Sequence, residues 1–264
     1  MMTFVDIHGH YAWNVDDGIR SREEAEKALK SAKEANIDTI VATPHIIPGR
    51  QTLKDINRIK DRINELKVLA NKYNIAVYEG CELFLNEDTV SALNEGVYIP
   101  IEKTKYLLCE FDVRHELDDD ERKVEERLHE IRVRGYIPLI AHVERYFHGK
   151  IDIDRVQYFI DNGCAIQLNA SSLIGIMGKH AKQNALILID EGMAHVISTD
   201  THRASGGRTP ATMCNCYQEL EKEYSEEILQ LLMHDNAMHI ISDEPVEFIE
   251  PTKRSFLSKL LKRR

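Results

Sequence analysis

The chain has no hydrophobic run long enough to cross a membrane, and its cysteines do not follow the pattern of a secreted protein. No stretch of its 264 residues approaches the roughly 20 consecutive apolar residues of a membrane span. The sequence enters a strand-like run directly, without the basic segment and apolar stretch of a signal peptide. The five cysteines are an odd number without framework spacing. We therefore expect a cytoplasmic protein with reduced thiols.

The charge balance is acidic, with 34 basic and 44 acidic side chains and a net charge of −10. This balance argues against nucleic acid as the main partner. Bound divalent cations would offset the negative charge locally, so an acidic chain is compatible with a cation-rich active site. The apolar fraction of 43% and the length allow a large core, in one α/β barrel or two smaller domains.

Strand-like and helix-like runs alternate along the chain. Strands are predicted at residues 4–10, 39–45, 75–82, 106–111, 137–145, 164–169 and 195–202. Helices are predicted at residues 21–35, 53–73, 120–134, 154–161 and 210–238. This alternation predicts a parallel sheet, and seven strands favour a barrel over an open sheet. Because no linker precedes Pro251, we expect one domain at residues 1–250 and a separate tail at residues 251–264.

Residues of metal-binding type recur at or just past the carboxyl ends of these strands. His8 and His10 are two residues apart, and alternate side chains of a strand share a face. Asp200 and His202 repeat this spacing. The carboxyl ends of barrel strands meet at one rim, where barrel active sites lie. The sequence therefore predicts one cluster that combines an aspartate of the Asp16–Asp17 pair with His8, His10, His45, Glu82, Glu110, His142, Asp200 and His202.

Mixed imidazole and carboxylate ligands suit zinc, manganese or iron. Nine ligands are too many for one ion, so two or three ions are predicted, with some carboxylates bridging. Clustered ions stabilise the attacking and leaving oxygens of a phosphoryl transfer and lower the pKa of bound water toward about 7. We expect a metal-bridged hydroxide to hydrolyse a phosphate ester without a covalent enzyme intermediate.

Seven motifs occur in order between Asp6 and about Pro210: Asp-Ile-His-Gly-His, Asp-Asp-Gly, Ala-Thr-Pro-His, Gly-Cys-Glu, Cys-Glu-Phe, Ala-His-Val-Glu-Arg-Tyr and Ser-Thr-Asp-Thr-His. With these motifs in this order, the sequence resembles the PHP (polymerase and histidinol phosphatase) superfamily. More narrowly, it resembles the manganese-dependent protein-tyrosine phosphatases encoded with bacterial capsule and exopolysaccharide genes. The resemblance implies a distorted (β/α)7 TIM-like barrel with three divalent ions, manganese being favoured over iron or zinc.

The resemblance also implies which residues hold each ion. The first ion would be held by His8, His10, Glu82 and Asp200. Glu82 would bridge to a second ion, which is completed by Glu110 and His142. The third ion would be held by Asp17, His45 and His202. Asp17 is preferred to Asp16 because the family pattern places the ligand immediately before the glycine.

Arg145 and Arg208 match the substrate arginines of the family. A guanidinium group fits the oxygens of a phosphate and adds charge stabilisation in the transition state. The family's substrate is the phosphotyrosine-rich tail of a capsule-regulating tyrosine kinase. Tyr11, Trp13 and Tyr146 lie next to motif residues and fit either an aromatic wall for a phenyl ring or a packing role. Residues 46–81 and 114–120 match the family less distinctively. Because these segments would shape the mouth of the site, the sequence does not determine the identity of the substrate.

Other functions fit parts of the pattern. A small-molecule phosphatase such as a histidinol phosphatase is the main alternative, and a nuclease is disfavoured by the acidic charge. A cysteine-dependent phosphatase is excluded because no cysteine is followed by arginine six positions later. A metal-stabilised binding module without activity is disfavoured by the complete set of ligands and arginines. The basic tail could contact an anionic membrane or an acidic partner, although a solvated terminus is favoured.

Overall fold

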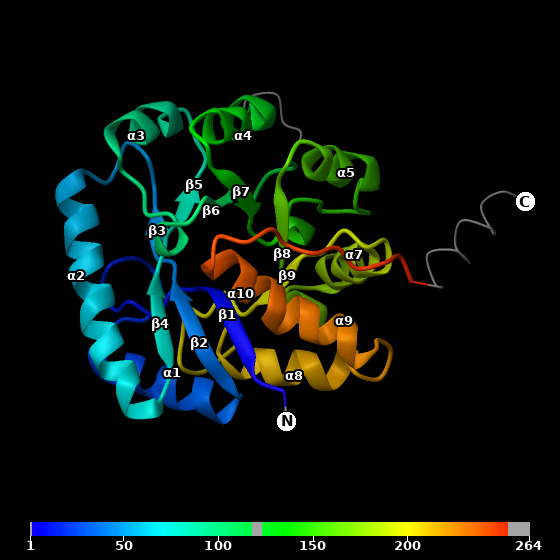
Figure 1. The fold of residues 1–264 in the computed structure, drawn as a ribbon, viewed down its shortest axis with the longest axis horizontal. Helices are drawn as coiled ribbons and strands as arrows, with labels where there is room; N and C mark the ends of the chain where they lie inside the picture. The colour runs from blue at the N-terminus through cyan, green and yellow to red at the C-terminus, as the bar shows by residue number, and fades with distance from the viewer. Residues whose placement is uncertain (1, 118–122, 253–264) are drawn as a thin grey trace, which may run out of the picture.

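The computed structural model describes residues 2–117 and 123–252, and its framework is a set of short parallel strands surrounded by helices (Figure 1). A three-stranded sheet has the order β1 (Phe4–Gly9), β2 (Ile37–Ala42), β4 (Ala76–Glu79). A six-stranded sheet has the order β3 (His45–Ile46), β5 (Glu82–Phe84), β6 (Tyr106–Glu110), β7 (Ile137–Ile140), β8 (Ala165–Asn169), β9 (Val196–Ser198). A parallel bridge between Gly9 and Thr201 brings the end of β1 beside the segment that follows β9. The curled parallel sheet forms a half-barrel.

Two of the seven predicted strand runs are each split into two strands. The second run is split between β2 and β3 at Pro44, which has no N–H group to donate to a ladder. The third run is split between β4 and β5 at Gly80, where an added Cβ atom would lie 3.0 Å from Val41. The Gly80 N–H donates to the Ala42 carbonyl, and the Glu82 N–H donates to the Pro44 carbonyl. These bonds continue the pairing of the two chain segments on either side of the break.

The longer helices lie around the outside of the sheets (Figure 1). They are α1 (Arg22–Glu34), α2 (Leu53–Ala70), α4 (Val124–Val133), α5 (Ile153–Asp161), α7 (Lys179–Asp190) and α8 (Ala211–Leu220). Shorter helices are α3 (Thr89–Glu95), α6 (Ala170–Leu173), α9 (Glu226–Gln230) and α10 (Asn236–Ile241). The helical sequence predicted over residues 210–238 forms α8, α9 and α10, with a turn between α8 and α9 and a π-helical turn at Leu231–Asp235 between α9 and α10.

The apolar faces of the helices and strands form two buried clusters. The larger cluster fills the space between the helices and the sheets, and the smaller one includes Val5, Ile7 and Val41. Within residues 2–117 and 123–252, no helix is long and apolar enough to span a bilayer. The basic part of the predicted tail, from Lys253 to Arg264, lies outside the described residues.

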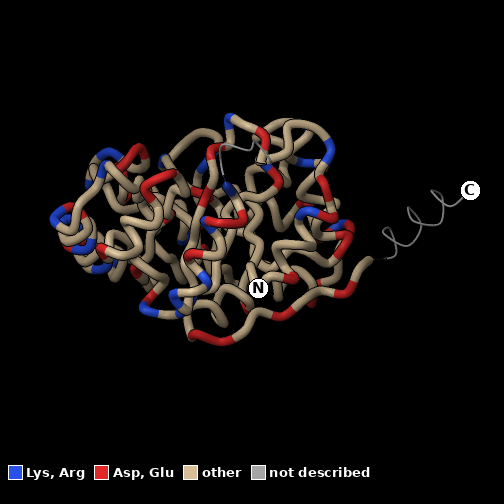
Figure 2. Tube along the Cα trace, turned by 90° about the horizontal axis from the view of Figure 1, so that it is seen from above, with Lys and Arg blue, Asp and Glu red and all other residues tan. Residues whose placement is uncertain are grey.

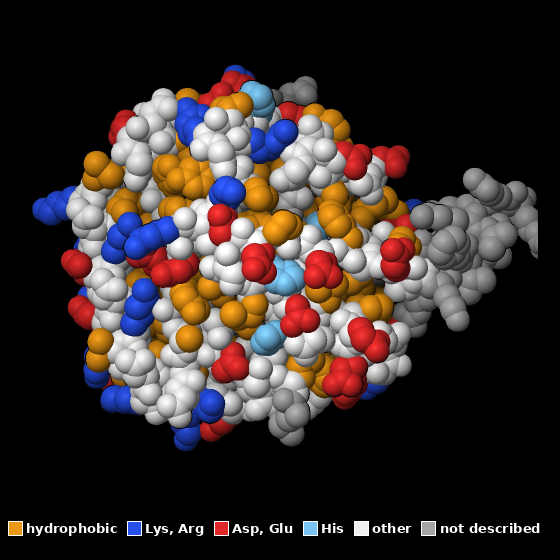
Figure 3. Space-filling view, viewed as in Figure 1, with side chains coloured by type: hydrophobic (Ala, Val, Ile, Leu, Met, Phe, Trp, Pro, Cys, Tyr) orange, Lys and Arg blue, Asp and Glu red, His pale blue; other side chains and the backbone are white. Residues whose placement is uncertain are grey.

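Basic and acidic residues are interspersed along the described chain (Figure 2). Acidic side chains gather across the middle of the face shown in Figure 3, where the segment after α10 runs in Figure 1. This distribution agrees with the net charge of −10.

Candidate metal centre

His8 and His10 stand at the carboxyl end of β1 with their side chains fully buried. The Nε2 atom of each lies 3.2 Å from Oε2 of Glu82. The same two nitrogens lie 3.6 and 3.4 Å from Oδ1 of Asp200. The shared face predicted from their spacing therefore directs both imidazoles at the same pair of carboxylates.

Glu82 is the central carboxylate of the cluster. It begins β5, and only 1% of its surface is exposed. Its Oε1 atom lies 3.0 Å from Nε2 of His142, and its Oε2 atom lies 3.2 Å from Nδ1 of His45. Burial alone would raise the pKa of Glu82, but His8 and His45 hold it well below its usual range. Glu82 is therefore an ionised carboxylate surrounded by imidazoles.

Glu110, at the end of β6, completes this side of the site. Its carboxylate lies 3.0 Å from Nδ1 of His45 and 3.5 Å from Nε2 of His142. Burial and Arg145 act to lower the pKa of His142, yet the two glutamates raise it to about 9. The carboxylates thus create a negative potential that holds protons on the imidazoles. The same potential would attract divalent cations.

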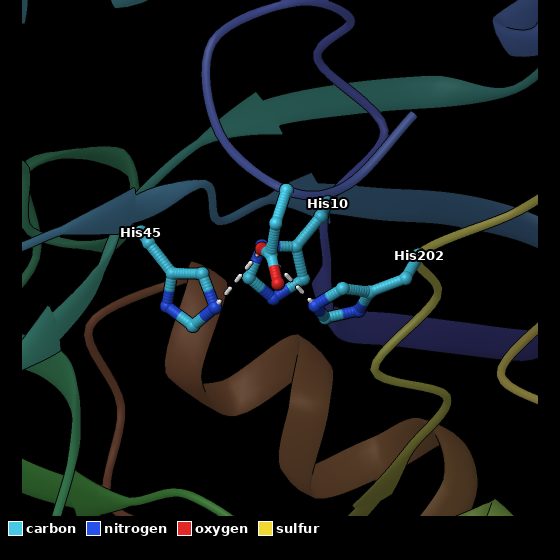
Figure 4. A group of neighbouring side chains, drawn as sticks. His10, His45 and His202 are labelled. Atoms are coloured by element: carbon cyan, nitrogen blue, oxygen red, sulfur yellow. Dashed lines mark ion pairs between the residues drawn. The ribbon is translucent and has the colours of Figure 1, made fainter. Parts of the chain in front are cut away.

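Asp17, His45 and His202 meet nearer the mouth of the site, and the imidazoles of His10, His45 and His202 lie close together (Figure 4). Oδ1 of Asp17 lies 3.4 Å from Nε2 of His45 and 3.5 Å from Nε2 of His202. The Asp17 side chain is 67% exposed, whereas that of His202 is 6% exposed. Asp17 is therefore the cluster's contact with solvent.

Asp200 and His142 have backbone conformations that suit their positions. Both have positive φ angles, 53° for Asp200 and 36° for His142, a region that residues other than glycine rarely adopt. In each case the chain turns sharply just after a strand, and the side chain is directed into the site. Such local strain is concentrated at functional sites.

The side chains leave a set of buried polar atoms without hydrogen-bond partners among the described residues. These atoms are Nε2 of His8, Nε2 of His10, Nδ1 of His45, Oε2 of Glu82, Nδ1 of His142, Oδ1 of Asp200 and Nε2 of His202. A buried polar group without a partner costs about 1–3 kcal/mol. All but Nδ1 of His142 also belong to the close nitrogen–oxygen pairs described above. The donor set therefore fits divalent metal ions.

The structure groups these donors slightly differently from the sets that the resemblance implies. Four groups have ligand atoms within 4.8 Å of one another: His10, Asp17, His45, His202; His8, His10, Glu82; His8, His142, Asp200; and His45, Glu82, Glu110. His10 thus also lies with the mouth group, and His45 also lies with the two glutamates. All nine predicted residues lie in one connected cluster.

A second layer of polar side chains orients the candidate ligands. Nδ1 of His8 lies 3.0 Å from Oε1 of Gln167, which also accepts the backbone N–H of His142. Gln167 donates to Asn169, and Asn169 donates to Oδ2 of Asp200 at 2.8 Å. These two β8 residues are not among the site residues predicted from the sequence. Partners of this kind fix the tautomer and orientation of metal-binding histidines.

Arg145 and Arg208 reach the cluster from outside the ligand set. Both side chains approach Oδ2 of Asp200, at 3.5 Å from Arg145 and 3.0 Å from Arg208. They line one pocket of about 430 Å³ with Asp17, His45, Glu82, Glu110, His142, Asp200 and His202. The pocket is thus bordered by two guanidinium groups beside the metal-ligand candidates.

The three aromatic residues considered for a wall are packing residues. Tyr11, Trp13 and Tyr146 are at most 5% exposed and belong to the main hydrophobic cluster. The Tyr11 hydroxyl donates to Asp6, and the Tyr146 hydroxyl accepts the backbone N–H of Phe111. None of the three is among the residues that line the pocket.

A family model described as capsular polysaccharide synthesis, CpsB/CapC, matches residues 4–242. The chain belongs to the CpsB/CapC family. CapC of Staphylococcus aureus is 31% identical over 94% of this chain and 95% of its own length. The tyrosine-protein phosphatase CpsB of Streptococcus pneumoniae is 27% identical over 91% of this chain and 99% of its own length. The resemblance stated from the motifs is therefore confirmed at the level of the family.

Solved structures give the same result for the fold. One similar crystal structure comes from work on YwqE of Bacillus subtilis and CpsB of Streptococcus pneumoniae, which are described as metal-dependent tyrosine phosphatases. Its alignment with this CpsB/CapC member covers 95% of this chain and 100% of the chain in the crystal. The TM-score is 0.79 and the sequence identity is 27%. The phosphotriesterase homology protein of Escherichia coli has a TM-score of 0.56 at 11% identity, covering 90% of this chain and 98% of its own. This second likeness concerns the fold alone.

Proposed function

We propose that the protein is a metal-dependent tyrosine-protein phosphatase that hydrolyses phosphotyrosine in proteins. The observation that carries this proposal is the convergence of nine metal-ligand candidates in one cluster, seven of which line a pocket together with two arginines. The names of the relatives CpsB and YwqE, both tyrosine-protein phosphatases, support the choice of substrate.

We further propose three divalent ions, with manganese favoured because the ligands are imidazole and carboxylate without thiolate. The ligands would be His8, His10, Asp17, His45, Glu82, Glu110, His142, Asp200 and His202. Bound ions would lower the pKa of water and offset the charge of the phosphate. Glu82 would hold more than one ion, because its two oxygens contact different histidines.

The protein side chains would position the phosphoryl group. Arg145 and Arg208 would bind its outer oxygens, exchanging part of their contact with Oδ2 of Asp200 for the phosphate. Gln167 would keep the His8 imidazole in a fixed tautomer through the contact at Nδ1. Because these groups are held in place before the substrate arrives, they contribute to transition-state stabilisation with little reorganisation.

The physiological substrate would be the phosphotyrosine tail of a bacterial tyrosine kinase that regulates capsule or exopolysaccharide synthesis. The family description and the resemblance support this partner. We infer a cytoplasmic enzyme, in agreement with five unpaired cysteines. Residues 1–250 would form one catalytic domain with a distorted (β/α)7 TIM-like barrel, and the tail at residues 251–264 could approach a membrane surface.

The proposal is tested by incubating the purified full chain and Mn²⁺ with a phosphotyrosine peptide, a phosphoserine peptide and histidinol phosphate. We expect preferential turnover of the phosphotyrosine peptide, abolished by a chelator and restored by added Mn²⁺. Turnover of histidinol phosphate alone would instead identify a small-molecule phosphatase. Metal binding without turnover of any ester would favour the binding module.

A further inference from the structure

One side of the pocket is apolar and is not part of the metal cluster. Ile47, Phe84 and Val113 line it, and all three are half-buried. Val113 packs against the main hydrophobic cluster, but neither Ile47 nor Phe84 is among the described residues that pack against either cluster. Exposed apolar surface costs about 25 cal/mol per Å², so two large side chains facing a pocket indicate an apolar ligand group.

The strand register places Ile47 and Phe84 next to the ligands. In the parallel pair of β3 and β5, His45 lies opposite Glu82 and Ile46 lies opposite Leu83. Continuing this register by one residue brings Ile47 opposite Phe84. Alternate residues of a strand share a face, so Phe84 follows Glu82 on the inward face, and Ile47 follows His45. The apolar pair therefore extends the ligand face toward the mouth of the pocket.

The two arginines reach the pocket from segments that follow later strands of the six-stranded sheet. Arg145 follows β7, Arg208 follows β9, and Ile47 and Phe84 belong to the β3–β5 end. A phosphoryl group held between the metal cluster and the arginines would leave its ester substituent room on the side of the apolar pair. A flat, apolar substituent would contact Ile47 and Phe84 there.

The apolar pair is held in place by polar contacts in the loops that carry it. Oε1 of Gln51 accepts the backbone N–H of Ile47 at 2.8 Å. Nδ2 of Asn86, two residues after Phe84, donates to the Pro48 carbonyl at 3.0 Å. These bonds tie the loop after β3 to the loop after β5. A contact surface fixed in this way binds a ring with a smaller loss of conformational entropy.

We propose that Ile47 and Phe84 contact the phenyl ring of phosphotyrosine and thereby determine the preference for aryl over alkyl phosphate esters. This inference rests on the proposed phosphatase function and adds two specificity-determining residues to it. Val113 borders the same surface from the β6 side.

The test compares the binding of phenylphosphonate and methylphosphonate to the manganese-loaded full chain by calorimetry. The unmodified protein is expected to bind phenylphosphonate about tenfold more tightly, because aromatic contacts are worth roughly 0.5–1.5 kcal/mol beyond area burial. Phe84→Ala and Ile47→Ala should each lower this ratio about threefold or more while leaving methylphosphonate affinity unchanged. Phe84→Leu should keep part of the preference.

Val68→Ala is the matched control, since Val68 is 69% exposed on α2 and does not line the pocket. It should leave both affinities unchanged. Equal affinity of the unmodified protein for the two phosphonates, or an unchanged ratio in both alanine variants with native circular dichroism, would refute the inference. Failure to hydrolyse the phosphotyrosine peptide would count against the phosphatase proposal instead, because the binding ratio does not depend on turnover.

Discussion

Asp16 and Asp17 are neighbours in sequence but differ in the structure. The Asp17 carboxylate is 67% exposed at the mouth of the cluster, whereas Asp16 is nearly buried. Oδ2 of Asp16 lies 2.7 Å from Nδ1 of His10 and accepts the backbone N–H of His45. Burial would raise the pKa of Asp16, but His10 lowers it below its usual value. Asp16 therefore orients two of the candidate ligands.

Replacing Asp16 by alanine should lower the affinity for Mn²⁺ by about 10- to 100-fold, the usual effect of removing a partner that orients a metal ligand. Titration of the metal-free protein by calorimetry measures this change. Asp61→Ala, at an exposed position on α2, is the matched control and should have no effect. Equal metal affinity in both variants would contradict the role given to Asp16.

Arg145 is expected to contribute to turnover and not to metal binding. Arg145→Ala should lower kcat/KM for a phosphotyrosine peptide by about 100-fold or more, the scale of removing one donor from a preorganised site. The metal content, measured by elemental analysis, should not change. Arg58→Ala, on the exposed side of α2, should retain full activity. Loss of metal from the Arg145 variant would show that the side chain supports the cluster instead.

Among the helices and strands, the carboxyl ends of the strands could be predicted from the sequence. The alternation of strand-like and helix-like runs and the direction of each strand are both local properties of the sequence. All seven runs contain a strand, and His8, Glu82 and Asp200 meet as the barrel argument predicts. The split at Gly80 was not predicted, because it depends on the close approach of β2 to this glycine. The contact surface of Ile47 and Phe84 was also missed. It becomes visible only when the pairing of β3 with β5 is known.

Helix α1 begins at the N-cap residue Ser21. The Ser21 hydroxyl accepts the backbone N–H of Glu24 at 3.2 Å, and the Glu24 carboxylate accepts the N–H of Arg20. Ser21→Ala should lower the free energy of unfolding by about 1 kcal/mol. Thermal unfolding should then show a loss of roughly 2–4 °C in Tm for a chain of this size.

Ser31→Ala in the same helix is the control for this prediction. Ser31 lies within α1 and its side chain makes none of the N-cap contacts, so alanine there should preserve or slightly raise Tm. Equal Tm values for the two variants would show that the cap does not stabilise the helix.

At the scale of the whole molecule, His195 links stability to pH at a point away from the metal cluster. Its ring is buried at the start of β9, and Nδ1 accepts the backbone N–H of Ile166 at 3.0 Å. Burial lowers the pKa of His195 to about 4. The folded protein therefore keeps this imidazole neutral, while the unfolded chain binds a proton below a pKa of about 6.5. This contribution to stability is complete above pH ~6.5 and is lost as the pH falls toward 4.

The pKa of His195 can be measured directly by NMR titration. Denaturant unfolding of the protein and of His195→Gln at several pH values tests whether stability depends on pH through this residue. The difference in free energy of unfolding between them should shrink as the pH falls from 6.5 to 4, by about 1.4 kcal/mol for each unit of pKa depression. A difference independent of pH would contradict a neutral buried His195.

The most direct measurement of the central claim is anomalous X-ray diffraction from crystals grown with Mn²⁺. Three manganese peaks are expected in the cluster, in contact with the nine ligands and with Glu82 between two of them. Arg145 and Arg208 should contact no ion. Crystals without anomalous peaks in the pocket, or with peaks that contact neither His8, Glu82 nor Asp200, would contradict the account.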